Sequence, residues 1–185
     1  QLHERLFYRP LLAAVASLPE GGLQLSAEQA QARLAAIGFR DAKGALAHIS
    51  ALTTGVSRRA TIQKALLPVL LEWFANGADP DSGLLAFRRL SEALGESHWY
   101  LRMLRDSAAA AERLTQILSG SRFVTDLLER IPEAVAWLED DAELLPRTLE
   151  ALDVEAAAIL SRHDDNESAV SAIRFMRRRE VLRLA

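Results

Sequence analysis

The chain has 185 residues, of which 50% are hydrophobic and 25% are charged, and its formal net charge is -3. This balance excludes disorder as the main state, and the length is sufficient for one sizeable core or two small ones. Cysteine is absent, which excludes disulfides, thiolate catalysis and cysteine-rich metal sites. The slightly acidic balance gives no general basic field for nucleic acid, and no apolar run approaches the roughly 20 residues that span a membrane. We therefore expect a cytoplasmic protein that binds neither nucleic acid nor membrane.

Hydrophobic residues recur at helical spacing along almost the whole chain, and no stretch alternates as a strand would. The first predicted helix covers residues 2–18, with Pro10 expected to kink it or to start a new turn, and Gly21-Gly22 ends it. The chain begins at Gln1 rather than at a methionine, and we expect it to be part of something longer.

The next two predicted helices have clear start and stop signals. Ser26 and Gln29 have the spacing of a capping box, and Gly38 is expected to end the helix that they begin. Asp41 can cap the following helix, which should end near Gly55.

Two longer helices follow. Ser57 is expected to cap a helix that Pro68 bends and Gly77 ends. In the next, Asp79 precedes Pro80, which is the typical order of an N-cap and a first helical residue.

Shorter helices are predicted in the second half of the chain. We expect Ser97 and Asp106 to begin two helices, with Gly120 ending the pair, and Ser121 and Pro132 to begin two more.

The C-terminal part is expected to hold two further helices. The acidic residues 139–141 are predicted to form a loop, a helix should run from about residue 146 to 162, and residues 163–166 should separate it from a final helix. The fold class is therefore all-α, an irregular bundle or array of roughly ten helices with no sheet. We expect all three tryptophans to lie in the core: Trp73, Trp99 and Trp137.

One histidine has a carboxylate beside it in the pattern of a metal-dependent phosphohydrolase, because imidazole and carboxylate together hold divalent ions. This pair is His163-Asp164. The alternative is that Asp164 and Asp165 belong to the N-terminal cap of the last helix, and we favour that interpretation. His3-Glu4 lacks the second histidine of a helical zinc site.

The strongest basic patches of the sequence are Arg58-Arg59 and the arginines of the last predicted helix. In helical projection Arg174, Arg177 and Arg178 share one face, while Arg179 and Arg183 lie four residues apart on another. We expect a solvated face, or a contact with a neighbouring acidic domain or a partner protein. No residue is assigned as catalytic, cofactor-binding or metal-binding.

Several short segments, taken in their order and spacing, resemble one enzyme family. They are LHERLFYRPLL (2–12), LTTGVSRR (52–59), LLPVLL (66–71), ADPD (78–81), WYL (99–101), SRF (121–123), IPE (131–133) and RRREVLRLA (177–185). The family is the bifunctional glutamine synthetase adenylyltransferase/adenylyl-removing enzyme, also called glutamate-ammonia-ligase adenylyltransferase.

The resemblance implies a large cytosolic enzyme in nitrogen regulation with two nucleotidyltransferase domains, which attach AMP from ATP to glutamine synthetase and remove it. It also implies ATP and magnesium for the parent enzyme, and glutamine synthetase and the PII protein as its partners. Each catalytic domain would carry a Gly-Ser turn followed by paired acids that hold magnesium. Here Gly120-Ser121 is followed by the single Asp126, and Asp79-Pro80-Asp81 lacks the turn before it.

We therefore expect residues 1–162 to be the helical region between the catalytic domains, and residues 163–185 to be a helix leading into the second one. The segment itself is expected to hold no cofactor and to have a connecting and regulatory role. Two alternatives stay open: an independent module that docks glutamine synthetase or PII through the arginines of the last helix, and the phosphohydrolase built on His163-Asp164.

Overall fold

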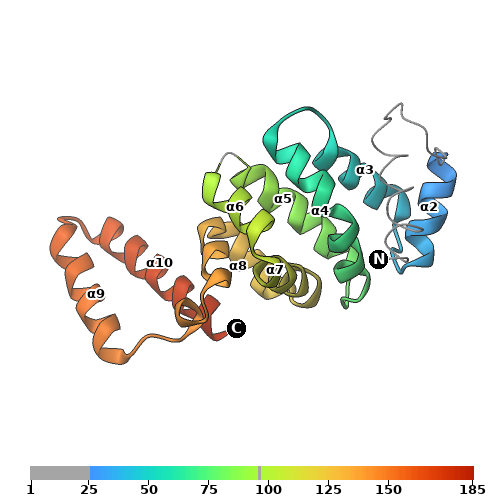
Figure 1. The fold of residues 1–185 in the computed structure, drawn as a ribbon. Helices are drawn as coiled ribbons and strands as arrows, with labels where there is room; N and C mark the ends of the chain where they lie inside the picture. Colours follow the sequence, from blue (N-terminus) through green and yellow to red (C-terminus); the bar gives the residue numbers. More distant parts are fainter. Residues whose placement is uncertain (1–25, 96) are drawn as a thin grey trace.

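The computed structural model of the protein describes residues 26–95 and 97–185, so the helix predicted over residues 2–18 and the pair His3-Glu4 lie outside the described residues. Within the described ranges the fold is all-α without a strand, as predicted (Figure 1). The α-helices are α2 (Ala27–Ala36), α3 (Ala42–Thr53), α4 (Arg58–Ala75), α5 (Pro80–Leu94), α6 (His98–Asp106), α7 (Ala108–Gly120), α8 (Arg122–Arg130), α9 (Leu149–Arg162) and α10 (Asn166–Leu184). Two short 3₁₀ helices, η2 (Pro132–Glu139) and η3 (Asp141–Leu144), precede α9.

The predicted caps explain where most of these helices begin. The capping box is present, since the Gln29 backbone N–H donates to the Ser26 hydroxyl at 3.2 Å and the Ser26 N–H donates to the Gln29 side chain at 2.9 Å. Asp41, Asp79 and Ser121 cap α3, α5 and α8 as expected. Side-chain oxygens thus satisfy backbone donors that the first turn of each helix leaves free.

Three expected boundaries were wrong. Asp106 is the last residue of α6, where its carboxylate pairs with Arg105, and Ser107 caps α7 instead. The acidic residues 139–141 are not an open loop, because η2 ends at Glu139 and η3 begins at Asp141. The helix expected from residue 146 begins at Leu149, because the Thr148 hydroxyl accepts the Ala151 N–H at 3.3 Å.

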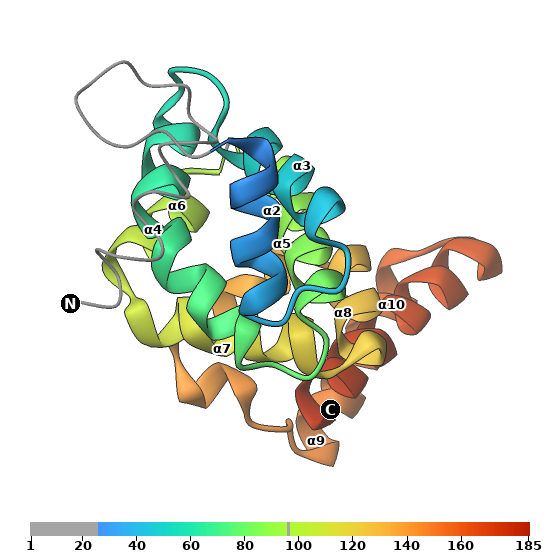
Figure 2. The ribbon, with the colours of Figure 1, turned by 90° about the vertical axis from the view of Figure 1, so that its right-hand side faces the viewer.

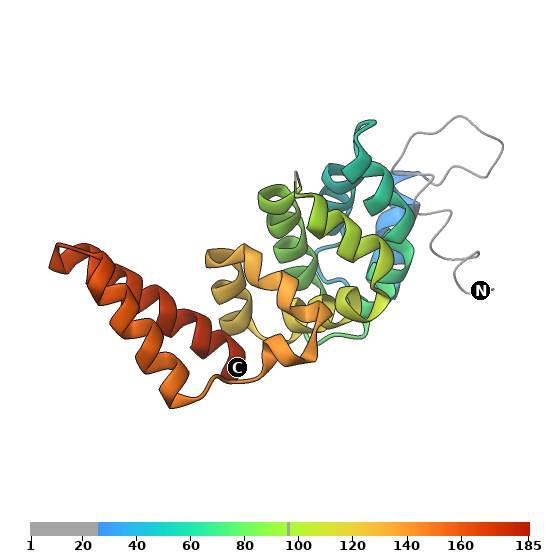
Figure 3. The same cartoon turned by 60° about the vertical axis from the view of Figure 1, so that its left-hand side comes forward.

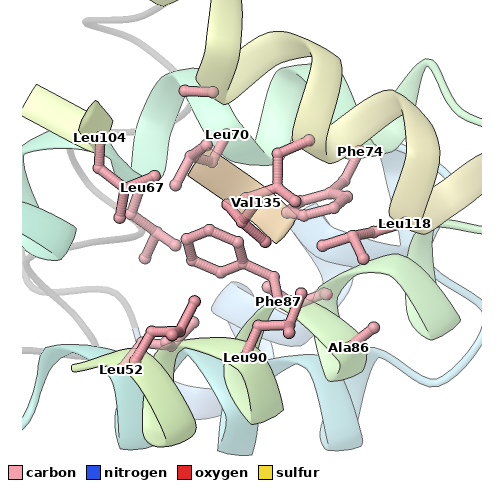
Figure 4. Packing of buried hydrophobic residues seen from close by; sticks show 14 of the residues in the cluster. Leu52, Leu67, Leu70, Phe74, Ala86, Phe87, Leu90, Leu104, Leu118 and Val135 are labelled. Atoms are coloured by element: carbon pink, nitrogen blue, oxygen red, sulfur yellow. The ribbon is translucent and has the colours of Figure 1, made fainter. Parts of the chain in front are cut away.

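Helices α2 to α8 and η2 form a body around α5, which contacts α3, α4, α7, α8 and η2. The Phe87 ring of α5 lies at the centre of the buried cluster, 5.9 Å from the Phe74 ring of α4 in an edge-on arrangement (Figure 4). Both side chains are fully buried. Burial of large aromatic and leucine side chains at native density supplies the main stabilisation of such a body.

The three tryptophans lie at the edge of this core. Trp73, Trp99 and Trp137 are partly buried and pack against the buried cluster, so they are not fully enclosed as the sequence suggested. Figure 2, seen from the α2 end, shows α2 and α3 in front of α5, and α3 contacts both of the others.

Helices α9 and α10 pack against each other as a hairpin that projects from the body, at the opposite end from α2 (Figures 1 and 3). We call residues 149–184 the hairpin. Helix α9 has no buried residue, and α10 buries Ala169 alone. The C-terminal part of α10 contacts α8, so the hairpin is attached to the body at one end.

Candidate interaction site on the last helix

Helix α10 begins at the turn that follows α9. The Asp165 carboxylate accepts the Ser168 backbone N–H at 2.8 Å, and this hydrogen bond lowers the pKa of Asp165. His163 and Asp164 are exposed beside it. In the part of the chain that the structure describes, no three His, Cys, Asp or Glu side chains are grouped so that they could hold a metal ion.

The structure divides the five arginines predicted as a contact site into two sets. Arg179 and Arg183 face the body and α9. The guanidinium of Arg183 lies 4.1 Å from the centroid of the Trp137 ring, and that of Arg179 lies 5.9 Å from it. Arg183 also donates to the Glu143 carbonyl oxygen at 3.0 Å. These two arginines are therefore occupied within the chain.

Arg147 extends this set into an ion-pair network. Its guanidinium donates to Glu180 of α10 at 2.7 Å and also pairs with Glu155 of α9. Glu180 accepts from Arg183 at 2.7 Å as well. Because the side chain of Arg183 is only 5% exposed and that of Glu180 12%, this network is shielded from water more than a surface ion pair is. We call Trp137, Arg147, Glu180 and Arg183 the clamp.

The remaining three arginines lie on the other face of α10. Arg174, Arg177 and Arg178 are exposed, and within the described residues none of them has an ion pair. Together with side chains of α8 they surround a hollow of about 300 Å³. We call this hollow the basic groove, and its lining is Phe123, Leu127, Arg130, Arg174, Arg177, Arg178 and Val181.

The contribution of α8 was missed in the sequence. Phe123 is 59% exposed, although aromatic residues usually find cover, and Arg130 ends the same helix. Phe123 and Arg130, seven positions apart and so on one face of a helix, were the available signal in the sequence. The proximity of α8 to α10, about 50 residues further along the chain, required the fold.

A second hollow of about 460 Å³ lies where α7, η2 and the end of α10 meet. Its lining is mainly apolar, with Trp137, Leu138 and Leu182, and two cations, Arg113 and Arg183, border it. Arg113 pairs with Asp141 at 2.6 Å and Arg183 belongs to the clamp, so neither cation is free for a ligand.

The acids that have the spacing of a magnesium motif serve as structural groups. Asp79 accepts the Ser82 backbone N–H and hydroxyl and pairs with Arg122 at 3.0 Å, and the hydrogen bonds from Ser82, with Arg122, hold the pKa of Asp79 below its usual value. The two carboxylate oxygens of Asp81 accept the backbone N–H groups of Arg40 and Asp41 at 2.9 and 3.1 Å. Both carboxylates therefore fix helix ends.

Several known proteins are similar to this chain over its whole length. A family model, glutamate-ammonia ligase adenylyltransferase, matches residues 111–185. The bifunctional glutamine synthetase adenylyltransferase/adenylyl-removing enzyme of Leifsonia xyli subsp. xyli is 69% identical over 190 residues, which cover 100% of this chain and 19% of that enzyme. The corresponding enzymes of Streptomyces coelicolor and Nocardia farcinica are 54% and 45% identical, again over 100% of this chain and 19% of theirs.

The chain belongs to this enzyme family as a segment. It spans about a fifth of the length of the adenylyltransferases that it matches. The part matched by the adenylyltransferase family model includes α8, η2, the hairpin, the clamp and the basic groove. No solved structure matches this chain. In the described residues, no helix is both long and apolar enough to cross a membrane.

Proposed function

We propose that the chain is the helical connecting segment of an enzyme that attaches AMP to glutamine synthetase and removes it. In this proposal the segment has no catalytic residue of its own. ATP and magnesium bind in flanking nucleotidyltransferase domains. Residues 163–185, which contain α10 and its N-terminal cap, lead into the second of these domains. The whole enzyme acts in the cytoplasm, where glutamine synthetase and PII are its partners.

The clamp is the observation that carries this proposal. Arg183 joins the end of α10 to the body through its cation–π contact with Trp137 of η2. Glu180 pairs with Arg183 and with Arg147, which ties the end of α10 to the segment that precedes α9. A hairpin without this attachment would pivot, because α9 has no buried residue. A fixed hairpin gives the segment a defined length and direction, which is what a connector between two active sites needs.

The acidic residues provide the test. In the longer enzyme, the equivalents of Asp79→Asn and Asp81→Asn should lower the melting temperature, because an amide nitrogen replaces one of the two accepting carboxylate oxygens at each position. Asp79→Asn also removes the ion pair with Arg122. They should leave the rate of AMP transfer within about twofold at a temperature where the protein is folded. Asp126→Asn, at an exposed position of α8, is the control for loss of charge.

Two results would overturn the proposal. One is a loss of AMP transfer of roughly a thousandfold in a folded Asp79→Asn or Asp81→Asn enzyme, as expected for a lost magnesium ligand. The other is AMP transfer to glutamine synthetase by the 185-residue chain alone with ATP and magnesium.

A second candidate function is docking of glutamine synthetase or PII by the hairpin. The unpaired state of Arg174, Arg177 and Arg178 favours it, since the other two arginines of α10, Arg179 and Arg183, have acidic partners. Titration of the fluorescently labelled chain with each protein tests this function. Saturable binding that weakens with salt and in Arg177→Ala/Arg178→Ala supports it, and an absence of binding at low salt rejects it.

A further inference from the structure

The basic groove combines an apolar floor with a cationic rim. Phe123, Leu127 and Val181 provide the apolar surface, and Phe123 is 59% exposed. Four arginines surround it: Arg130 from α8 and Arg174, Arg177 and Arg178 from α10. The residues lining the groove include no acid, so the groove itself does not neutralise this charge.

The positive charge of the basic groove is opposite in sign to the net charge of the whole chain, which is -3. The nearest acids of α8 belong to another surface. Glu129 pairs with Arg89 of α5 at 3.4 Å, and Asp126 lines a separate hollow with Arg89 and Arg122. Four like charges held close together repel one another, and a partner that supplies carboxylates relieves this repulsion.

The chemistry of the groove selects among anionic partners. Apart from Phe123, in the first turn of α8, the lining residues lie inside α8 and α10, where their backbone N–H groups are used in helical hydrogen bonds. The groove therefore has no series of backbone donors of the kind that cradles phosphate. Its one aromatic side chain provides no series of stacking platforms for a nucleic acid strand. Its volume of about 300 Å³ is at the lower limit of small-molecule pockets but suits one large apolar side chain.

From these features we propose that the basic groove docks an acidic amphipathic protein segment, in which one apolar side chain enters over Phe123, Leu127 and Val181 while flanking carboxylates pair with Arg174, Arg177 and Arg178. The apolar side chain gives the segment its position, and the arginine rim gives it orientation and selects against basic segments. This inference goes beyond the connecting role and does not depend on it.

The test uses the 185-residue chain and synthetic helical peptides of about 15 residues. The probe peptide carries two leucines four positions apart with glutamates on both sides of them. One matched peptide has glutamine in place of each glutamate, and the other has serine in place of each leucine. Methyl NMR signals of Leu127 and Val181 report on occupancy of the groove, with inorganic phosphate and phosphatidylserine vesicles as competing anionic probes.

We expect the acidic peptide to shift both methyl signals and each matched peptide to bind at least about tenfold more weakly. Arg177→Ala/Arg178→Ala and Phe123→Ser should each weaken binding of the acidic peptide to a similar extent, whereas Arg162→Ala, an exposed arginine at the other end of the hairpin, should not.

The proposal is overturned if the Leu127 and Val181 signals do not move, if Arg177→Ala/Arg178→Ala binds as well as the unchanged chain, or if phosphate or vesicles produce the same shifts. None of these outcomes alters the predicted behaviour of Asp79→Asn and Asp81→Asn.

Discussion

Arg183, in the last turn of α10, stacks its guanidinium on Trp137 of η2 with 4.1 Å between the guanidinium carbon and the ring centroid. The two residues are 46 positions apart, and their contact fixes the end of the hairpin to the body. The side chain of Arg183 is 5% exposed and also pairs with Glu180 at 2.7 Å. A cation that is shielded from water and contacts both an aromatic ring and a carboxylate is held more firmly than a cation at the surface.

Arg183→Ala should loosen the hairpin without unfolding the body. The change removes the contact with Trp137 and leaves Glu180 with one fewer partner, at a cost of about 1–3 kcal/mol. Amide hydrogen exchange should speed up in α10 and α9 and stay unchanged around Phe87 in α5. Arg162→Ala, at an exposed position of α9, should have no such effect. Equal exchange rates in the two variants would show that the clamp does not hold the hairpin.

Stability should fall as the solution is acidified through the pKa of histidine. Burial, and then the positive charge of Arg88, lower the pKa of His48 from its ordinary value of 6.5. The Arg88 guanidinium lies 3.2 Å from the His48 Nδ1 atom. The unfolded chain therefore binds a proton at a higher pH than the folded chain does, so the contribution of neutral His48 is complete above pH 6.5 and is lost below it.

Melting temperatures measured between about pH 5.5 and pH 8 check this dependence. The melting temperature of the unchanged chain should decrease toward the acidic end, and His48→Gln should reduce that slope. The same slope in both proteins would exclude His48 as its source.

Gly83→Ala should destabilise the body. A Cβ atom at this position of α5 would lie 2.9 Å from Phe74 Cδ1 and 2.9 Å from Ser119 Cβ, and all these groups are buried. Overpacking of a close-packed core costs about 1–3 kcal/mol, which exceeds the helical advantage of alanine of roughly 1 kcal/mol. Gly120→Ala is the matched change, since its Cβ would meet no heavy atom within 4 Å. Chemical denaturation should therefore separate the two variants, and a stabilised Gly83→Ala protein would contradict this packing.

Much of this arrangement was predictable from local chemistry. The Ser26–Gln29 box, the Asp79 cap and the Ser121 cap depend on atoms a few residues apart, so the sequence alone sufficed to place them. The start of α7 was misplaced because Asp106 and Ser107 are both good caps, and the pairing of Asp106 with Arg105 leaves the role to Ser107.

The division of the five arginines was only half predictable. Helical spacing correctly separated Arg177 and Arg178 from Arg179 and Arg183. Helical spacing could not show which face is covered. Trp137 and Glu143, which contact Arg183, precede it by about 40 residues, and the face with Arg177 and Arg178 is left to solvent. The role of Arg130 in the basic groove likewise depends on the contact between α8 and α10.

Gln63 of α4 offers a stabilising substitution. Its side chain is 1% exposed, and within the described residues neither its amide nitrogen nor its amide oxygen has a hydrogen-bond partner. Gln63→Met keeps the volume and removes a desolvated polar group, so it should raise the free energy of unfolding by about 1–2 kcal/mol. Gln63→Glu should lower it, because a carboxyl group is harder to bury. Urea denaturation distinguishes these outcomes, and a destabilised Gln63→Met would reveal a partner for the amide.

The central claim is that the hairpin and the body form one rigid spacer, and a distance between two spin labels tests it most directly. The chain has no cysteine, so Ala65→Cys in α4 and Ala157→Cys in α9, both exposed, provide unique labelling sites on the body and on the hairpin. Pulsed electron paramagnetic resonance should give one narrow distance distribution, which broadens when Arg183→Ala is added. A broad or multiple distribution in the protein with an intact clamp would contradict the claim.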